Sequence, residues 1–263
     1  MKMITTKTVL VAGAALLMAP SLFAKHGGGR QGTDVLHFAI KESFTNDTAS
    51  SGSDETGAKG TVTLNQAEQG SANKETMKIV ITGLDPNTDY SLDAITSDNP
   101  SSTDVQDFTS DGKGHASLSF SNSGKGKKNI DLGGTDLDPV SHVLELDVVR
   151  VDNGLAVLTA DLTNPSSLKY LVKRDISSDT TPASLSISSS RSRTSFRLTA
   201  SGLDASTDYD LVFNGSTHQT VTTDANGNLT VTSVTLPDNI LDLNSVALMD
   251  AADTTTIVST TLP

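Results

Sequence analysis

One eight-residue stretch occurs twice in this chain and constrains its fold more than any other feature. Residues 83–90 read GLDPNTDY, and residues 202–209, 119 positions later, read GLDASTDY. An alternating apolar and polar run precedes each stretch, and a second such run begins at its tyrosine. Because this alternation is typical of strands with one buried face, the stretch predicts a corner between two strands. The chain therefore carries two copies of one β unit.

The repeated corner resembles the tyrosine corner of fibronectin type III and immunoglobulin-like β-sandwiches, in which the pattern Leu-x-Pro-x-Thr-x-Tyr bridges the two sheets. The matching residues, which we expect to be structural, are Leu84, Pro86, Thr88 and Tyr90 in the first copy and Leu203, Thr207 and Tyr209 in the second. The resemblance implies that each phenol bonds a backbone group a few residues upstream, and we expect the hydroxyl to donate to a carbonyl. The resemblance covers these eight residues in each copy. The strand order differs from fibronectin type III, because about half of each copy follows the tyrosine strand.

The first 24 residues have the pattern of a secretory signal peptide. Two lysines precede an apolar run over residues 9–19, and cleavage is expected after Ala24. The run is shorter than the ~20 residues that span a bilayer, and no later stretch approaches that length. We therefore expect an exported mature chain without a membrane span, located in the periplasm, at the cell surface or outside the cell. Residues 25–32 form a glycine-rich leader.

We expect the fold class to be all-β, with two tandem antiparallel β-sandwich modules after the signal peptide. The first module spans residues 33–163 and the second spans residues 167–263. The segment between them is short and contains proline, which predicts modules placed end to end with limited freedom. The strands that open the modules, over residues 35–40 and 168–172, are expected at sheet edges, where neighbouring lysines would restrain pairing with a partner.

The charge of the chain argues against nucleic acid as a partner. The formal net charge is −12, and removing the signal peptide deletes two lysines and no acids, which brings the mature chain to about −14. Binding to phosphates requires a basic surface. The chain also has no cysteine, so an exported protein of this kind depends on its hydrophobic core alone for stability.

The sequence contains none of the short motifs that carry nucleophilic, zinc-hydrolytic or nucleotide chemistry, and we expect a protein that is not an enzyme and holds no cofactor. One weak metal candidate exists. Asp224, Asn226 and Asn228 present oxygen atoms at alternating positions, as at the start of a calcium-binding loop, but the acid that would complete the loop is missing. A hairpin turn that uses asparagine and glycine for positive φ explains the same residues.

Two classes of function fit these observations. The first is a structural, adhesive or surface-interaction protein that acts by self-association or by contact with other surface or extracellular molecules. Duplicating a sandwich without adding reactive groups favours this class, because it multiplies surface and reach. The second is a periplasmic or secreted binding module for a cation or a small ligand. Sugar binding is disfavoured, because the chain has no tryptophan and only three tyrosines, two of which belong to the corners.

Overall fold

The computed structural model describes residues 34–46, 55–123, 129–133, 135–190 and 193–262, and in these residues the fold is all-β with two sheets. The predicted signal peptide and leader, residues 1–32, lie outside the described residues. Two single-turn 3-10 helices occur in the described part, η1 (Val140–His142) and η2 (Ile240–Asp242). No helix there is long and apolar enough to cross a membrane.

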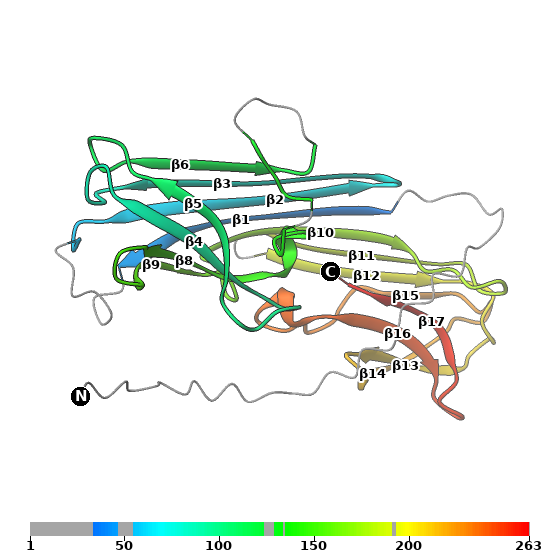
Figure 1. Ribbon diagram of the computed structural model, residues 1–263. Helices are drawn as coiled ribbons and strands as arrows, with labels where there is room; N and C mark the ends of the chain where they lie inside the picture. Colours follow the sequence, from blue (N-terminus) through cyan, green and yellow to red (C-terminus); the bar gives the residue numbers. More distant parts are fainter. Residues whose placement is uncertain (1–33, 47–54, 124–128, 134, 191–192, 263) are drawn as a thin grey trace. The chain divides into compact units, whose positions relative to one another are not determined.

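Both copies of the repeat use the same order of elements (Figure 1). The strands of the first copy are β1 (Val35–Asn46), β2 (Lys59–Gln69), β3 (Ala72–Thr82), β4 (Asp89–Thr96), β5 (Thr103–Thr109), β6 (Ala116–Ser121), β7 (Ile130–Asp131), β8 (Val143–Arg150) and β9 (Leu155–Asp161). The strands of the second copy are β10 (Ser167–Asp175), β11 (Ala183–Ser190), β12 (Arg193–Ala200), β13 (Asp208–Phe213), β14 (Ser216–Thr222), β15 (Leu229–Val231), β16 (Ser245–Asp250) and β17 (Thr256–Thr261). Strand β7 has no counterpart in the described part of the second copy, and each 3-10 helix precedes the last two strands of its copy.

The larger sheet contains strands of both copies, in the order β15-β12-β11-β10-β1-β2-β3-β6-β7. Strands β5, β4, β8 and β9 form the second layer of the first copy, and β9 joins the larger sheet by pairing with the end of β1. Strands β14, β13, β16 and β17 form a separate sheet, which is the second layer of the second copy. Buried apolar side chains from all these layers make one continuous hydrophobic core.

The first strands of the two copies, β1 and β10, pair with each other inside the larger sheet. We predicted that both strands lie at sheet edges, and this prediction is wrong. Strand β1 pairs with β2 on one side and β10 on the other, and β10 also pairs with β11. The lysines do not prevent the pairing, because Lys41, Lys169 and Lys173 are exposed on the face away from the core. The copies therefore lie edge to edge in one sheet, and the placement end to end is also wrong.

The pairing of β1 with β10, which we call the seam, has local two-fold symmetry. The three pairs on the core face are Leu36 with Val172, Phe38 with Tyr170 and Ile40 with Leu168. Phe38 and Tyr170 occupy the same position in their copies. Leu36 is equivalent to Leu168 and Ile40 to Val172, so exchanging the two copies turns one flanking pair into the other. Because both rings are buried, the core of one copy continues into the core of the other at this point.

The two copies differ in whether the outer edge of their last strand, β9 or β17, pairs with another strand. In the first copy, β1 continues beyond the seam, and Thr45 and Asn46 pair with Thr159 and Leu158 of β9. In the second copy, β10 ends at Asp175, and the chain returns directly to β11. Within the described ranges, β17 pairs with β16 alone. The two layers are thus joined along this side in the first copy and are separate in the second.

Candidate functional site

Each predicted corner is bonded to a tight turn that leads from one layer to the other, from β5 to β6 in the first copy and from β14 to β15 in the second. We call these assemblies the corner–turn units: residues 83–90 with 110–115 in the first copy, and residues 202–209 with 223–228 in the second. The Tyr90 hydroxyl accepts a hydrogen bond from the Asp85 N–H at 3.1 Å. In the second copy, Tyr209 accepts from the Asp204 N–H at the same distance.

The direction of these bonds is opposite to our prediction, which had each phenol donating to a backbone carbonyl. The carbonyls of Asp85 and Asp204 already accept hydrogen bonds from the side chains of Ser110 and Thr223, respectively. Asp85 and Asp204 therefore present their N–H groups, and not their carbonyls, to the phenols.

The other predicted corner residues make matching bonds in the two copies. The Leu84 N–H donates to the Gly114 carbonyl, and the Leu203 N–H donates to the Gly227 carbonyl, both at 3.1 Å. The hydroxyls of Thr88 and Thr207 donate to the carbonyls of residues 86 and 205 at 3.2 Å. Because this bond uses the backbone carbonyl, the exchange of Pro86 for Ala205 leaves it unchanged.

The weak metal candidates lie in the tight turn of the second corner–turn unit, between β14 and β15. Asp224 Oδ1 accepts hydrogen bonds from the N–H groups of Asn226 and Asn228, both at 2.8 Å. These bonds, with that to Asn228 first, lower the pKa of Asp224. Asp111 makes the same pair of bonds with residues 113 and 115 of the first copy. The residues form a tight turn, but the predicted hairpin is wrong, because β14 pairs with β13 and β15 pairs with β12 in the other sheet. In the described part, no group of three acidic, histidine or cysteine side chains is placed to hold a metal.

A buried ionic network distinguishes the first corner from the second. The Tyr90 hydroxyl also donates to the carboxylate of Glu55, whose side chain is fully buried. Arg150 Nη1 contacts Glu55 Oε1 at 3.2 Å and Asp85 Oδ2 at 2.5 Å. Burial, reinforced by the bond to Glu55, raises the pKa of Tyr90. In the second copy, Asp250 occupies the place of Arg150, opposite the corner tyrosine.

Sequence reasoning missed this network. Glu55 lies in a polar segment without apolar periodicity, and Arg150 is separated from it by 95 residues. The one available signal was the change from Arg150 to Asp250 at matched positions of the repeat.

Acidic side chains lie directly opposite one another on the outer face of the first copy's second layer. Asp93 of β4 lies opposite Asp104 of β5 and opposite Asp147 of β8. Glu145 of β8 lies opposite Asp161 of β9. Burial first, and then the neighbouring carboxylates, raise the pKa of Asp104 and of Glu145. We call these five residues the acidic rows, and like charges opposite each other in a sheet are destabilising.

The second copy is neutral where the first carries the acidic rows. Matching the strands by the residues that pair with each corner tyrosine places Val212 at the position of Asp93 and Ala247 at that of Asp147. Continuing the match along the last two strands places Ser245 and Thr261 at the positions of Glu145 and Asp161. The outer face of the second layer is therefore acidic in one copy and uncharged at four matched positions in the other.

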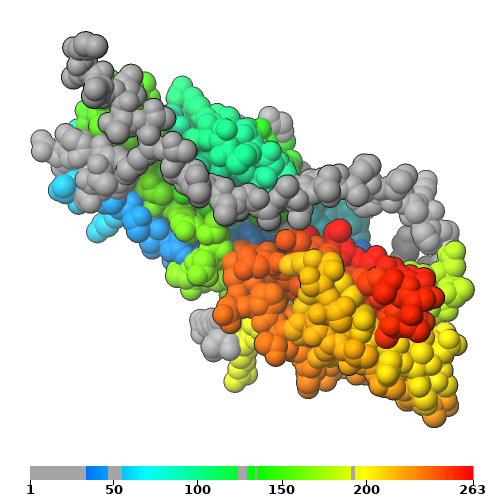
Figure 2. Space-filling view, turned by 90° about the horizontal axis from the view of Figure 1, so that it is seen from below, coloured from blue at the N-terminus to red at the C-terminus, as the bar shows by residue number. Residues whose placement is uncertain are grey.

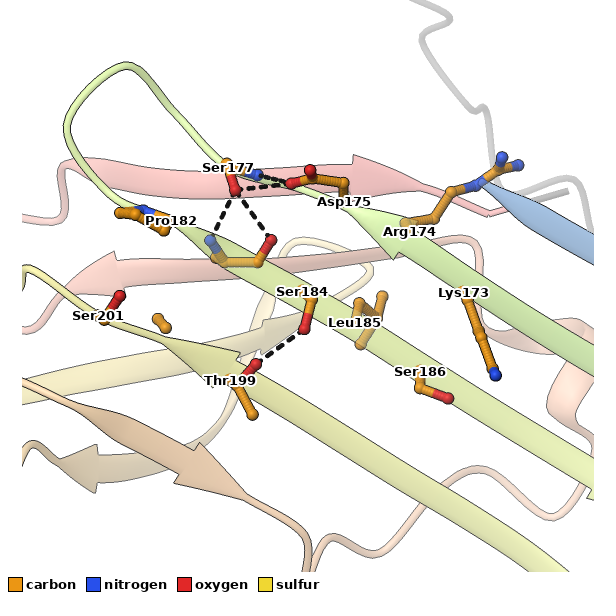
Figure 3. Close-up of a pocket in the computed structure, with 12 residues that line it drawn as sticks. Lys173, Arg174, Asp175, Ser177, Pro182, Ser184, Leu185, Ser186, Thr199 and Ser201 are labelled. Carbon is orange, nitrogen blue, oxygen red and sulfur yellow. Dashed lines mark hydrogen bonds between the residues drawn. The ribbon is translucent and has the colours of Figure 1, made fainter. Parts of the chain in front are cut away.

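The second copy also has a shallow hollow of about 510 Å³ on the larger sheet, over β10, β11 and β12. Figure 3 shows the hydroxyl groups of Ser184 and Thr199 turned toward each other. Ser184 and Thr199 are hydrogen-bonded at 2.8 Å, and Ser177 binds Asp175 and the backbone of Ala183. The hydroxyls of Ser177, Ser184 and Thr199 therefore form hydrogen bonds within the protein.

Comparisons with protein-family models, with curated proteins and with solved structures find no match to this chain. The candidate sites therefore rest on the geometry described above.

Proposed function

We propose that this is an exported, non-catalytic protein with a structural, adhesive or surface-interaction role, built from two tandem sandwich modules behind a signal peptide. The observation that carries the proposal is the seam, at which two copies of one unit associate through strand edges. Seven residue pairs join β1 to β10, from Val35 with Lys173 to Lys41 with Ser167. Main-chain pairing between strand edges is also how separate β proteins bind one another.

The charge distribution supports a protein that acts through its surface. The acidic rows keep like charges opposite each other at a cost in stability, and the second copy shows that the same layer can be built with neutral residues at the matched positions. A net charge of −12 makes copies of the chain repel at low ionic strength. We therefore expect monomers or weak oligomers in dilute salt and stronger association as salt is added.

Cell fractionation of the source organism tests the location and the processing. The full chain with a C-terminal epitope tag should be recovered from the periplasm, the cell surface or the medium, with its N-terminus after Ala24. Protease treatment of intact cells separates surface exposure from the periplasm. Confinement to the cytoplasm contradicts the proposal, and so does a hydrolytic activity that one His or Asp substitution abolishes.

The hollow on the second copy favours one alternative, a binding module for a cation or small ligand. Its charged lining residues are Lys173, Arg174 and Asp175, and serine and threonine side chains add hydroxyl groups. Thermal unfolding in the presence of divalent cations, phosphate and small carboxylic acids tests this alternative. A stabilising ligand whose effect is lost in Lys173→Ala supports a binding module, and the absence of any shift leaves the structural role.

A further inference from the structure

The side of β17 that faces away from β16 is an open sheet edge, and the first copy shows how an edge of this kind is filled. Strand β9 occupies the same place in the first copy as β17 does in the second. Its residues Leu158 and Thr159 pair with Asn46 and Thr45 of β1. The Thr45 hydroxyl also donates to the Thr159 carbonyl at 3.1 Å. An added strand therefore completes this edge in the first copy.

The equivalent residues of the second copy are Val258 and Ser259. Leu158 lies opposite Val148 of β8, and Val258 lies opposite Leu248 of β16. Val148 and Leu248 each stand two positions before the residue that pairs with the corner tyrosine. The register of both hairpins shifts just before these residues, so the local geometry also matches. No described residue of this chain pairs with Val258 or Ser259 from the open side.

Apart from one bulge near its start, strand β17 lacks the features that usually block an exposed edge. Its sequence, TIVSTT, has no charged residue, proline or glycine, and two of its six residues are valine or isoleucine. Natural proteins protect edges with lysine, inward-pointing charges, proline or bulges. The irregularity in the β16–β17 pairing lies near the start of β17, which leaves Val258–Thr261 regular. Figure 2 shows the end of the chain, in red, at the surface of the second copy.

The other edge strands are less suited to pairing. Strand β5 carries Asp104 and Asp107, which would repel another copy of an acidic chain. Strand β14 is uncharged and, like β17, is regular after a bulge near its start, where His218 is the extra residue and stacks on Phe213 with ring centroids 4.6 Å apart. Its counterpart in the first copy, β5, pairs only with β4 in the described part, so the first copy gives no precedent for an added strand at this edge.

We propose that β17 binds the β17 strand of a second copy, antiparallel, about a two-fold axis at Ser259. This inference rests on the proposed function and names the surface and the partner. A second copy fits because the edge is uncharged, so two such edges meet without the repulsion expected elsewhere between acidic chains. The seam is a precedent inside the molecule, since it joins two copies of this unit by antiparallel pairing about a local two-fold axis.

Single-cysteine variants test the pairing directly, because the chain contains no cysteine. Residues directly opposite each other in antiparallel strands have Cα atoms about 4.5–5.5 Å apart, within the range that a disulfide bridges. Oxidised Ser259→Cys should therefore form a covalent dimer at protein concentrations and salt where the wild type associates. Thr217→Cys, on β14, is the matched control and should stay monomeric. Efficient dimer formation by the control and not by Ser259→Cys would overturn the proposal.

Charge variants provide a second, independent measurement. Ser259→Lys places two lysines together at the axis, and it should raise the dimer dissociation constant about fivefold in sedimentation experiments, the upper end of a like-charge pair. Ser259→Asp should do the same, and an equal mixture of the two variants should recover dimers. Thermal unfolding of each variant shows that the fold is retained.

The outcome also separates this inference from the proposed function. A wild type that stays monomeric up to high salt and yields no Ser259→Cys dimer overturns the β17 pairing, while export and surface location can still hold. Confinement to the cytoplasm instead overturns the proposed function, whatever the cross-linking result.

Discussion

The two copies of the repeat make the same hydrogen bonds at their corner–turn units, but they differ in charge and in how their layers close. Tyr90 and Tyr209 accept from equivalent N–H groups at the same distance, and Asp111 and Asp224 hold equivalent turns. Only the first copy has the buried Glu55–Arg150 network, the acidic rows and a second layer joined to β1. The comparison shows that the corner is a local structure that tolerates different surroundings.

The largest expected difference between the copies comes from Arg150. Arg150→Ala leaves the carboxylate of Glu55 buried without its cation, and removing one partner of a buried ion pair costs about 3–5 kcal/mol. Asp250→Asn at the matched position keeps the turn bond to Ala252 and should change the free energy of unfolding by less than about 0.5 kcal/mol. Urea denaturation of both variants measures the difference. Equal effects at the two positions would show that the network adds nothing to the first copy.

The glycines of the two turns should respond alike. A Cβ on Gly114 or Gly227 would lie 2.0 or 1.9 Å from the carbonyl oxygen of the corner leucine, and both residues have a φ of +72°. Alanine at either position should cost about 2–3 kcal/mol, because steric conflict adds to backbone strain.

Two other glycines separate the contributions of strain and contact. Gly154 and Gly215 also have positive φ, but a Cβ added to either would meet no atom within 4 Å, so alanine there should cost only about 1 kcal/mol. A loss at Gly114 or Gly227 no larger than this would mean that the corner moves away from the turn without penalty.

Removing the corner hydroxyls sharpens the comparison further. Tyr209→Phe leaves the Asp204 N–H without its acceptor and should cost about 1 kcal/mol. Tyr90→Phe also removes the bond to the Glu55 carboxylate, so its cost should be about 2 kcal/mol. Thermal unfolding of the two variants tests the order, and a larger loss at Tyr209 would contradict the role given to Glu55.

The smallest expected effect concerns the acidic rows. Asp93→Asn removes a carboxylate that lies opposite two others, and it should stabilise the protein by about 0.5 kcal/mol at pH 7. Asp210→Asn is the control, because Asp210 lies opposite Thr220 and Met249 and its neutralisation relieves no such pair.

The pH dependence of this gain has a definite sign. The pKa of Asp104 is raised in the folded protein, so its ionised form is penalised by folding above that pKa, and the penalty disappears below the ordinary carboxyl pKa. The contribution of Asp104 to stability should therefore rise as the pH falls through this window, and the advantage of Asp93→Asn should shrink. A gain that stays constant down to about pH 3, below the ordinary carboxyl pKa, would rule out charge repulsion as its cause.

The amino-acid sequence by itself determined the strand alternation, the two corners and the two tight turns. These depend on residues close together in the chain: Tyr90 binds the backbone five residues before it, and Asp111 binds residues two and four positions after it. The required glycines and the apolar period of two are visible without knowledge of the fold. For this reason the all-β class and both corners were predictable, although the direction of the tyrosine bond was not.

The tertiary structure alone decided which strands meet. An alternating strand shows which of its faces is buried, but its pattern does not name the neighbour that will take its backbone hydrogen bonds. Val35 pairs with Lys173 and Glu55 meets Arg150 because the whole sheet brings distant segments together. The same holds for β17, whose open edge arises because β10 ends at Asp175, whereas β1 continues to Asn46 and pairs with β9.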